Sequence, residues 1–338
     1  MPFRAGARRI LIAQAVLGAA TVAVLFWRVD ILGAFRQVPK VEYGWLLPGL
    51  AMFTVSKAIH AYRWRYFLRH RGEIPTGQLF ALFLVSNLTN AIIPLRAGDL
   101  LRVELPNRRF GVPRAEMVST VFVVESLLDG VTFVILLSGG ILLLDLPDTL
   151  QQTLLTLSVL VLSIFAVTVL AARFGERWDP AESRALRLLP ARLRPAAGRR
   201  YAETVAGLAS LRTAAATAVA IGISIVAWCA EIAVYWFMGH AFGLDMTVAE
   251  ALVVTIAANL AVAIPVTPWN VGPYEVVVTE ALVAMGSPRD VASGYAIGAH
   301  LLLLAWIGLT GVAAMWSLNL RPRDLVPQPA TQEPPPGA

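Results

Sequence analysis

Long apolar runs separated by short polar segments dominate the pattern of side chains along this chain. A helix needs roughly 20 mainly apolar residues to cross a hydrocarbon core about 30 Å thick. Such runs predict six full membrane spans, at about residues 10–27, 44–60, 117–144, 150–172, 213–239 and 289–316. The pattern therefore predicts an all-α, polytopic membrane protein.

Two further apolar segments are interrupted by amide side chains and end in turns that contain proline and glycine. Residues 78–93 contain Asn87 and Asn90, and residues 248–266 contain Asn259. Broken apolar segments of this kind are typical of helices that enter a membrane and return to the side they came from. We therefore expect two re-entrant hairpins beside the six crossings.

The chain also repeats itself at an offset of about 175 residues. The motif Gly-Val-Pro-Arg at residues 111–114 recurs as Gly-Ser-Pro-Arg at 286–289. Upstream of it, Pro-Leu-Arg-Ala-Gly at 94–98 matches Pro-Trp-Asn-Val-Gly at 268–272. Because both blocks keep their order, we expect an internal repeat rather than a chance match.

The two copies cover about residues 44–144 and 213–316, here called repeat 1 and repeat 2. An odd number of predicted crossings separates corresponding elements, so the copies should face opposite ways. Inverted repeats with paired broken helices are typical of alternating-access transporters, with the binding site near the membrane midplane. A duplication kept for packing alone is the alternative.

Composition narrows the class of protein further. Hydrophobic residues make up 57% of the 338 residues and charged residues only 15%, whereas soluble domains carry about 25% charged residues. The net charge of +6 could indicate a nucleic-acid partner, but the arginines gather in short segments between apolar runs. Such segments are typical of a cytoplasmic face. We therefore expect membrane lipids, and no nucleic acid, as partners.

The positions of basic residues predict the orientation of the chain in a cell membrane. Four arginines follow the second predicted span: Arg63, Arg65, Arg69 and Arg71. Residues 173–212 are rich in arginine and should lie as amphipathic helices on the anionic inner surface. The loop at 145–148 is acidic, so we expect both termini in the cytoplasm. A transmembrane domain then covers residues 1–320, and residues 321–338 form a proline-rich, disordered tail.

Two carboxylates in the third predicted span are candidate site residues. A charged group at the centre of a membrane helix costs at least about 2.5 kcal/mol, so it needs a partner or a water-filled cavity. Glu125 and Asp129 lie on one helical face, where a cation or a bound proton would relieve their repulsion. A structural ion pair with Arg96, Arg102 or Arg114 is the alternative.

The first hairpin turn is a candidate anion site. Arg96 and Arg102 flank Gly98 and Asp99 at the start of a helix. Exposed backbone N–H groups and the positive end of a helix dipole attract anions. Together with the two carboxylates, these residues predict a pocket of mixed charge.

The second repeat supplies its own candidates: Thr267, Asn270, Gly272, Glu275 and His300. Its proline-rich turn has irregular backbone, which within a membrane must be buried in protein or line a cavity. His300 occupies the place of Glu125 and could pair with a carboxylate or titrate near neutral pH; a packed histidine is the alternative. Glu231, in the fifth span, needs a partner from another helix.

The sequence contains no P-loop, dinucleotide fingerprint, metal-type Cys or His cluster, or nucleophile elbow. We therefore expect no cofactor, no metal and no enzymatic activity. Any transport should be driven by a gradient or run down one. The single cysteine, Cys229, cannot form an intrachain disulfide, and we expect it to serve packing.

Three blocks of the sequence resemble the flippase-like membrane family, which shares its domain with the transmembrane part of lysylphosphatidylglycerol synthases. The blocks are Asn90 to Arg102, Glu125 to Asp129, and Pro268 to Glu275. The resemblance covers about residues 10–316. Two positions depart from the family pattern: Ser126 follows Glu125 where an arginine is usual, and Trp269-Asn270 replaces Gly-Gly.

The resemblance implies that the protein moves an anionic phospholipid or polyprenyl-phosphate-linked lipid between leaflets. In that role the two arginines would hold the lipid phosphate, and the carboxylates and His300 would balance charge or carry protons. The sequence holds no aminoacyl-transferase domain, so we do not expect a complete synthase. An intramembrane lipid-modifying enzyme and a non-transporting scaffold for envelope lipid synthesis are the alternatives. A second copy or a lipid-synthesis protein is a candidate partner.

Overall fold

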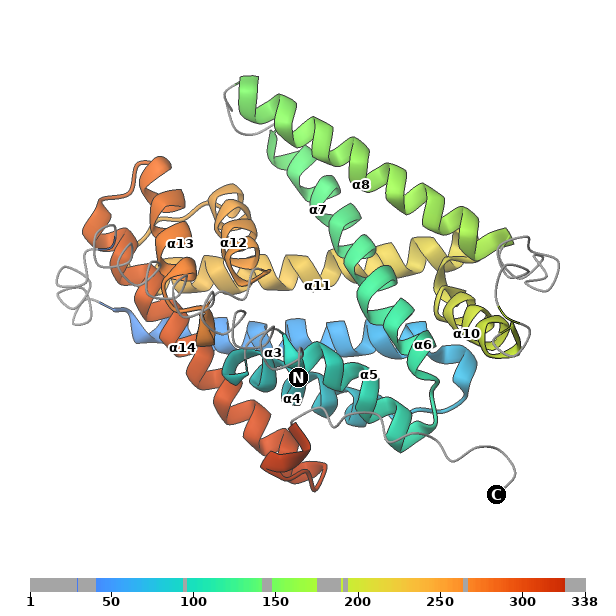
Figure 1. The fold of residues 1–338 in the computed structure, drawn as a ribbon. Helices are drawn as coiled ribbons and strands as arrows, with labels where there is room; N and C mark the ends of the chain where they lie inside the picture. Colours follow the sequence, from blue (N-terminus) through green and yellow to red (C-terminus); the bar gives the residue numbers. More distant parts are fainter. Residues whose placement is uncertain are drawn as a thin grey trace, which may run out of the picture.

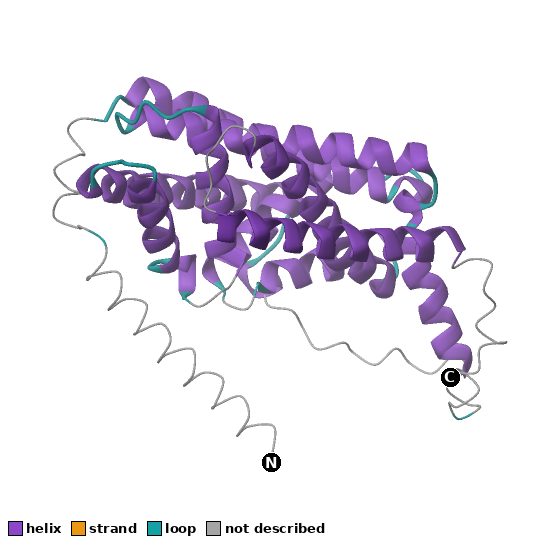
Figure 2. Cartoon of the chain, turned by 90° about the horizontal axis from the view of Figure 1, so that it is seen from above, coloured by secondary structure: helices purple, strands orange, loops and turns teal. Residues whose placement is uncertain are grey.

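The computed structural model describes residues 29, 41–93, 96–141, 148–174, 190, 194–263 and 267–325. Within these ranges the chain consists of helices joined by short loops, with no strand (Figure 2). The first predicted span, residues 10–27, lies outside the described residues. The principal helices are α3 (Tyr43–Phe67), α4 (Thr76–Ile92), α5 (Ala97–Phe110), α6 (Arg114–Val118), α7 (Ser126–Ile141), α8 (Asp148–Phe174), α10 (Arg194–Gly207), α11 (Ala214–Ala241), α12 (Val248–Ala263), α13 (Pro273–Ala284) and α14 (Arg289–Ser317).

The long apolar helices confirm an all-α polytopic membrane protein. Among the described residues, four helical segments are long and apolar enough to cross a membrane: Arg114–Ser138, Leu155–Phe174, Ala214–Ala241 and Arg289–Ser317. The first of these joins α6 to α7 through a π-helix, Ser119–Glu125. Helix α3 has 25 residues, which is also long enough to cross. It is more polar than the other four because Lys57, His60 and Arg63 lie within it.

Helices α3 and α11 run antiparallel along the centre of the molecule (Figure 1). The backbone N–H of Glu42 donates to Ala241, and the hydroxyl of Tyr66 donates to the carbonyl of Ala216. Opposite ends of the two helices therefore meet. Since α3 opens repeat 1 and α11 opens repeat 2, this arrangement agrees with copies of opposite direction.

Each repeat contains the same order of elements: a long helix, a short helix, a turn, a second short helix and a second long segment. In repeat 1 these are α3, α4, α5 and the segment from α6 to α7; in repeat 2 they are α11, α12, α13 and α14. The short helices have 17, 14, 16 and 12 residues, in chain order. They form two helical hairpins, α4–α5 and α12–α13, where the sequence predicts re-entrant elements.

The tips of both hairpins contain a non-glycine residue with left-handed backbone. Arg96 has φ 54° and Asn270 has φ 51°. They occupy equivalent places in the repeated motif, Pro-Leu-Arg-Ala-Gly and Pro-Trp-Asn-Val-Gly. A left-handed conformation is uncommon for residues with a Cβ atom and is often found at functional sites. Left-handed backbone at this equivalent position is thus common to both tips, and the second tip adds left-handed backbone at Trp269 (φ 61°) and Gly272 (φ 100°).

The apolar core has two parts. One part packs the C-terminal half of α3 against α4 and α5 and contains Trp64, Phe67 and Leu82. The other packs α11 against α12, α13 and α14 and contains Met238 and Tyr295. Polar and charged side chains lie where these two apolar parts meet.

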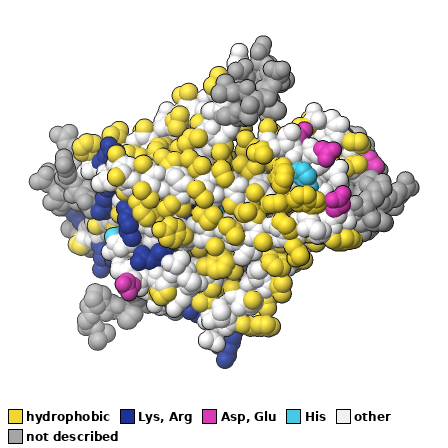
Figure 3. Space-filling model, turned by 180° about the vertical axis from the view of Figure 1, so that it is seen from behind, with side chains coloured by type: hydrophobic (Ala, Val, Ile, Leu, Met, Phe, Trp, Pro, Cys, Tyr) yellow, Lys and Arg dark blue, Asp and Glu magenta, His cyan; other side chains and the backbone are white. Residues whose placement is uncertain are grey.

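The surface carries its charges at the two ends. In Figure 3, most of the visible lysine and arginine side chains gather at one end, most acidic side chains at the other, and hydrophobic side chains between them. A basic end is typical of the cytoplasmic side of a membrane protein. The positions of the two termini stay a prediction.

Two predicted surface segments are partly described. Helix α10 lies within the segment predicted at 173–212, and the hydroxyl of Ser119 in the π-helix donates to the carbonyl of Thr204 at 2.9 Å. The predicted disordered tail begins with ordered chain, because Pro322–Leu325 form a 3-10 helix and Leu325 is buried. Residues 326–338 lie outside the described residues.

Candidate functional site

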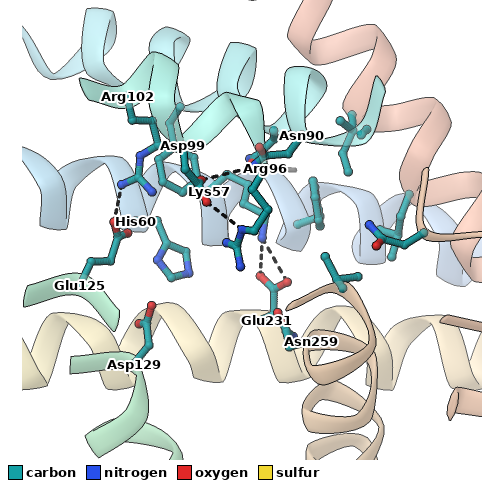
Figure 4. Close-up of a pocket in the computed structure, with 18 of the residues that line it drawn as sticks. Lys57, His60, Asn90, Arg96, Asp99, Arg102, Glu125, Asp129, Glu231 and Asn259 are labelled. Carbon is teal, nitrogen blue, oxygen red and sulfur yellow. Dashed lines mark hydrogen bonds and ion pairs between the residues drawn. The ribbon is translucent and has the colours of Figure 1, made fainter. Parts of the chain in front are cut away.

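A cavity of about 590 Å³ lies at the centre of the molecule, between the two hairpin tips and the paired helices α3 and α11. Sites for small molecules usually have volumes of about 300–1,000 Å³. Figure 4 shows charged side chains from α3, α5, α7 and α11 directed toward this space. Seven of the predicted site residues line it: Arg96, Asp99, Arg102, Glu125, Asp129, Asn270 and His300.

Arg63 connects the two carboxylates of the third predicted span. Its Nη2 atom donates to Glu125 Oε1 at 2.8 Å, and its Nη1 atom pairs with Asp129. Asp129 also accepts from the indole N–H of Trp228 at 2.8 Å. The side chain of Arg63 has 0% exposure, so the sequence prediction of a cytoplasmic loop position for Arg63 is wrong. Helix α3 continues beyond residue 60 because its next turns are buried against the core.

Glu125 has a second cationic partner, Arg102 of α5. The guanidinium of Arg102 lies 4.9 Å from the ring centroid of Trp64 and 4.7 Å from that of Phe83. Cation–π contacts of this kind stabilise a desolvated arginine. Of the three arginines considered as partners of the carboxylates, only Arg102 takes that place in the described part of the chain. Arg96 pairs with Asp99 and Arg114 pairs with Glu104.

Lys57 of α3 and Glu231 of α11 form an ion pair in the cavity lining. Lys57 Nζ lies 2.8 Å from Glu231 Oε2, and the hydroxyl of Ser56 donates to the same oxygen at 2.7 Å. The expectation that the partner of Glu231 comes from another helix is confirmed. A buried carboxylate within a membrane-spanning helix costs free energy unless it has such partners.

The first hairpin tip differs from the predicted anion site in one respect. The Gly98 N–H donates to Asn90 Oδ1 at 2.8 Å, so this backbone donor is not open to a ligand as expected. A Cβ atom on Gly98 would lie 2.0 Å from the carbonyl oxygen of Ser86, which explains the need for glycine. Asp99 accepts from Asn90 and, at 2.7 Å, from Arg96. The side chain of Arg96 remains 50% exposed and is the accessible cation of this tip.

The second tip is held by contacts among its own residues. Glu275 Oε2 accepts the Gly272 N–H at 2.6 Å, and Thr267 donates to the carbonyl of Val271 at 2.7 Å. Glu275 Oε1 lies 2.6 Å from His300 Nδ1, so His300 has a carboxylate neighbour. His300 is also packed, because its ring stacks on that of Tyr274 with the centroids 4.0 Å apart. Among the predicted residues, Gly98, Thr267, Gly272 and Glu275 support the two tips and do not line the cavity.

Several polar atoms of cavity-lining side chains are buried without a hydrogen-bond partner among the described residues. They are His60 Nδ1, Asn87 Nδ2, Arg102 Nε, Asn270 Oδ1 and Tyr274 Oη. A buried polar group without a partner costs about 1–3 kcal/mol. A functional site is one common reason for such a group.

Sequence reasoning missed three site residues on α3: Lys57, His60 and Arg63. The signal was present, because each interrupts an otherwise apolar helix, and they recur at three-residue spacing on one helical face. His60 packs between two aromatic rings, with its centroid 5.8 Å from that of Phe83 and 5.7 Å from that of Trp228.

The fold and the cavity define a polytopic α-helical membrane protein with a central site of mixed charge. The family model of the lysylphosphatidylglycerol synthase transmembrane region matches residues 10–311, so the chain belongs to this family. It is also similar to Glycosyltransferase AglD of Haloferax volcanii, with 23% identity over 93% of this chain and 55% of that protein. The chain thus spans about half the length of this curated relative.

Proposed function

We propose that the protein moves an anionic phospholipid or a polyprenyl-phosphate-linked lipid between the two leaflets of the cell membrane. The family supports a role connected with membrane lipids. A lipid headgroup needs a polar path across the hydrocarbon region, whereas its acyl or prenyl chains can stay in the bilayer. The cavity offers polar surface between helices that are long and apolar enough to cross a membrane.

One observation carries this proposal: charged side chains and buried polar atoms without partners surround an open central space. If the charges served packing alone, the ion pairs would fill the core. Instead, Arg96 is half exposed and the Asp129 side chain is 23% exposed, and both line the cavity. A phosphate in the cavity would accept hydrogen bonds from Arg96 and Arg102, because guanidinium groups match phosphate oxygens in geometry and charge.

The paired acids would limit the affinity for the phosphate. Asp99 and Glu125 already hold the two arginines, so a phosphate enters as a competing anion and can leave again. In an alternating-access cycle, the α4–α5 and α12–α13 hairpins would open in turn toward each leaflet. We propose that both hairpins are re-entrant and that both termini are cytoplasmic.

Lipid movement by the purified full-length protein in liposomes is the direct test. Headgroup accessibility of a fluorescent anionic phospholipid and of a labelled prenyl phosphate should change over time with wild-type protein. Arg96→Asn and Glu125→Gln should slow it at least about tenfold, because each removes a charge from the cavity. Asparagine keeps the left-handed backbone that residue 96 requires.

Arg108→Gln is the matched control, because Arg108 is exposed, pairs with Glu104 and lies outside the cavity lining. It should leave the rate unchanged. Equal rates in all four proteins would reject the site, and no movement above empty liposomes would reject transport.

An intramembrane enzyme is the second candidate, because the archaeal relative carries the name of a glycosyltransferase. Glu125 or Asp129 would have to act as general base. Both carboxylates accept hydrogen bonds from Arg63, so Arg63 occupies oxygen atoms that a general base would use to take a proton from a substrate. We therefore favour transport without catalysis, and without a cofactor. A new lipid product from the purified protein, seen by thin-layer chromatography, would favour the enzyme.

A scaffold without transport activity would instead co-purify with a lipid-synthesis protein and move no lipid in liposomes. A second copy of the chain is another proposed partner. Cross-linking in native membranes separates these two cases by the mass of the product.

A further inference from the structure

Glu275 differs from the other buried acids of the described residues in the kind of partner it has. Glu275 pairs with His300, and both side chains are only 6% exposed. An arginine or lysine stays charged near neutral pH, whereas a histidine gains and loses its charge there. The other buried acids each have an arginine or lysine partner: Asp99 with Arg96, Glu116 with Arg71, Glu125 with Arg63 and Arg102, and Glu231 with Lys57.

The pair of Glu275 and His300 therefore sets the charge balance of the cavity. Among the described residues, the arginine and lysine charges at the cavity equal the acids they pair with: Lys57, Arg63, Arg96 and Arg102 against Asp99, Glu125, Asp129 and Glu231. Glu275 adds one negative charge, which a proton on His300 balances. An anionic headgroup would add another, and an unbalanced charge within the membrane costs free energy.

The geometry of the pair leaves a place for that proton. Glu275 Oε1 lies 2.6 Å from His300 Nδ1, so one proton already lies in this hydrogen bond. A further proton on the second ring nitrogen, Nε2, changes the pair from one negative charge to neutral. The His300 side chain lines the cavity, so the proton can come from water there.

The elements packed against α14 supply no other cation to Glu275 among the described residues. Helix α4 contains no charged residue, and α13 places the ring of Tyr274 on that of His300, with the centroids 4.0 Å apart. Helix α11 contributes Tyr235 and Glu231 to the cavity lining, and Glu231 is already paired.

His60, on α3, is the other described histidine of the cavity lining and suits a proton less well. It packs between the rings of Phe83 and Trp228. Lys57 and Arg63 lie three residues away on either side of it, on the same helical face. These cations would repel a second positive charge at His60, and no acid pairs with it among the described residues.

Glu275 also connects the pair to the tip of the α12–α13 hairpin. Its second oxygen, Oε2, accepts the Gly272 N–H at 2.6 Å, and Gly272 has left-handed backbone with φ 100°. Loss of the proton would leave the ionised Glu275 without a cationic partner. The proton-free pair therefore favours a position of the hairpin in which water reaches Glu275.

From these contacts we infer that His300 and Glu275 bind a proton that crosses the membrane together with the anionic lipid, one proton for each headgroup charge. The proton and the headgroup strengthen each other's binding, because the proton removes the negative charge that the headgroup would otherwise meet. Such a coupling is reciprocal. This inference rests on the proposed function and names the coupling ion of the same site.

Movement of a labelled lipid under a pH gradient tests the inference. The full-length protein is reconstituted in phosphatidylcholine liposomes with impermeant buffers and a trace of fluorescent phosphatidylglycerol, whose phosphodiester keeps one negative charge near neutral pH. At one proton per lipid, a gradient of one pH unit should enrich the probe up to about tenfold in the leaflet that faces the alkaline side. A membrane potential at equal pH should leave the distribution even, because the proton and the anion together carry no net charge.

Two variants test the assignment to this pair. Glu275→Gln removes the unbalanced charge and keeps an acceptor for the Gly272 N–H, and the double variant Glu275→Gln, His300→Gln removes both groups that bind the proton. Both should still move the probe, more slowly, and reach an even distribution under the gradient. His240→Gln is the matched control and should keep the enrichment, because His240 lies outside the cavity lining and contacts the Trp236 carbonyl.

The outcomes distinguish this inference from the proposed function. An even distribution with wild-type protein under the pH gradient, or enrichment driven by the membrane potential, overturns the inference and leaves lipid movement standing. Enrichment that survives in the double variant overturns the assignment to this pair. Loss of all movement in both variants, with normal size-exclusion profiles, assigns the pair to lipid binding and also overturns it. No movement with wild-type protein above empty liposomes rejects the proposed function itself.

Discussion

Loss of the Arg63 side chain should destabilise the protein more than any change at the cavity surface. Arg63→Ala leaves the carboxylates of Glu125 and Asp129 without their shared cation and the Ser224 hydroxyl without its donor. Removing one partner of a buried ion pair costs about 3–5 kcal/mol. Arg102 still neutralises Glu125, and Asp129 is partly exposed, so we expect about 3 kcal/mol.

The loss is measurable as a thermal shift of the detergent-solubilised protein. The entropy of unfolding, roughly 2 cal/mol/K per residue, converts about 3 kcal/mol into a fall of Tm of roughly 4 °C. The double variant Arg63→Met, Asp129→Asn removes the cation and one of its two acids together and leaves the Glu125–Arg102 pair in place. A neutral replacement of similar volume costs little or stabilises. This variant should recover most of the fall in Tm caused by Arg63→Ala, but it should not recover lipid movement.

A double variant that is as unstable as Arg63→Ala would refute this reasoning, because the loss would then come from packing and not from unpaired charge. An Arg63→Ala protein with unchanged Tm would refute it as well. Arg63→Lys keeps the charge but cannot contact both carboxylates in the same planar geometry. Its Tm should lie between those of the wild type and Arg63→Ala.

Three further predictions concern the hairpin tips and the α3–α11 contact. Gly98→Ala should lower the yield of folded protein in size-exclusion chromatography, because the added Cβ meets the backbone of α4; a normal profile would show that this tip can relax. Lys57→Glu and Glu231→Lys should each lower the Tm by several degrees, and the exchanged double variant should recover part of it; additive losses would contradict a direct pair. His300→Gln should lower the Tm by less than Glu275→Ala, because Glu275 also accepts the hydrogen bond from the second tip. If thermal unfolding shows the larger fall for His300→Gln, then His300 and not Glu275 stabilises the tip.

Hydrophobic pattern alone predicted the long helices well. The predicted spans 213–239 and 289–316 correspond to α11, Ala214–Ala241, and α14, Arg289–Ser317. Such runs leave a membrane chain few alternatives, because every backbone N–H and C=O in lipid must be paired within the segment. The two hairpins were predicted from apolar segments broken by asparagines and ending in proline- and glycine-containing turns.

The contacts of the site could not be predicted in the same way. Arginines after an apolar run usually mark a cytoplasmic loop, and only the tertiary structure shows that Arg63 contacts the carboxylates of Glu125 and Asp129 instead. At the first tip, the carboxamide of Asn90 reaches forward to occupy the Gly98 N–H. The Arg63 ion pairs and the Asn90–Gly98 hydrogen bond are contacts between different elements, and such contacts leave no periodic pattern in the sequence.

The junction of Lys57 with Glu231 shows where the two repeats differ most directly. Glu231 and its partner Ser56 hold matching places in the two repeats, so α3 and α11 touch near the axis that relates them. At these equivalent places one repeat carries a hydroxyl and the other a carboxylate, and the neighbouring Lys57 balances the negative charge. A change of Lys57 or Glu231 alone would therefore leave an unpaired charge at the contact between the two halves.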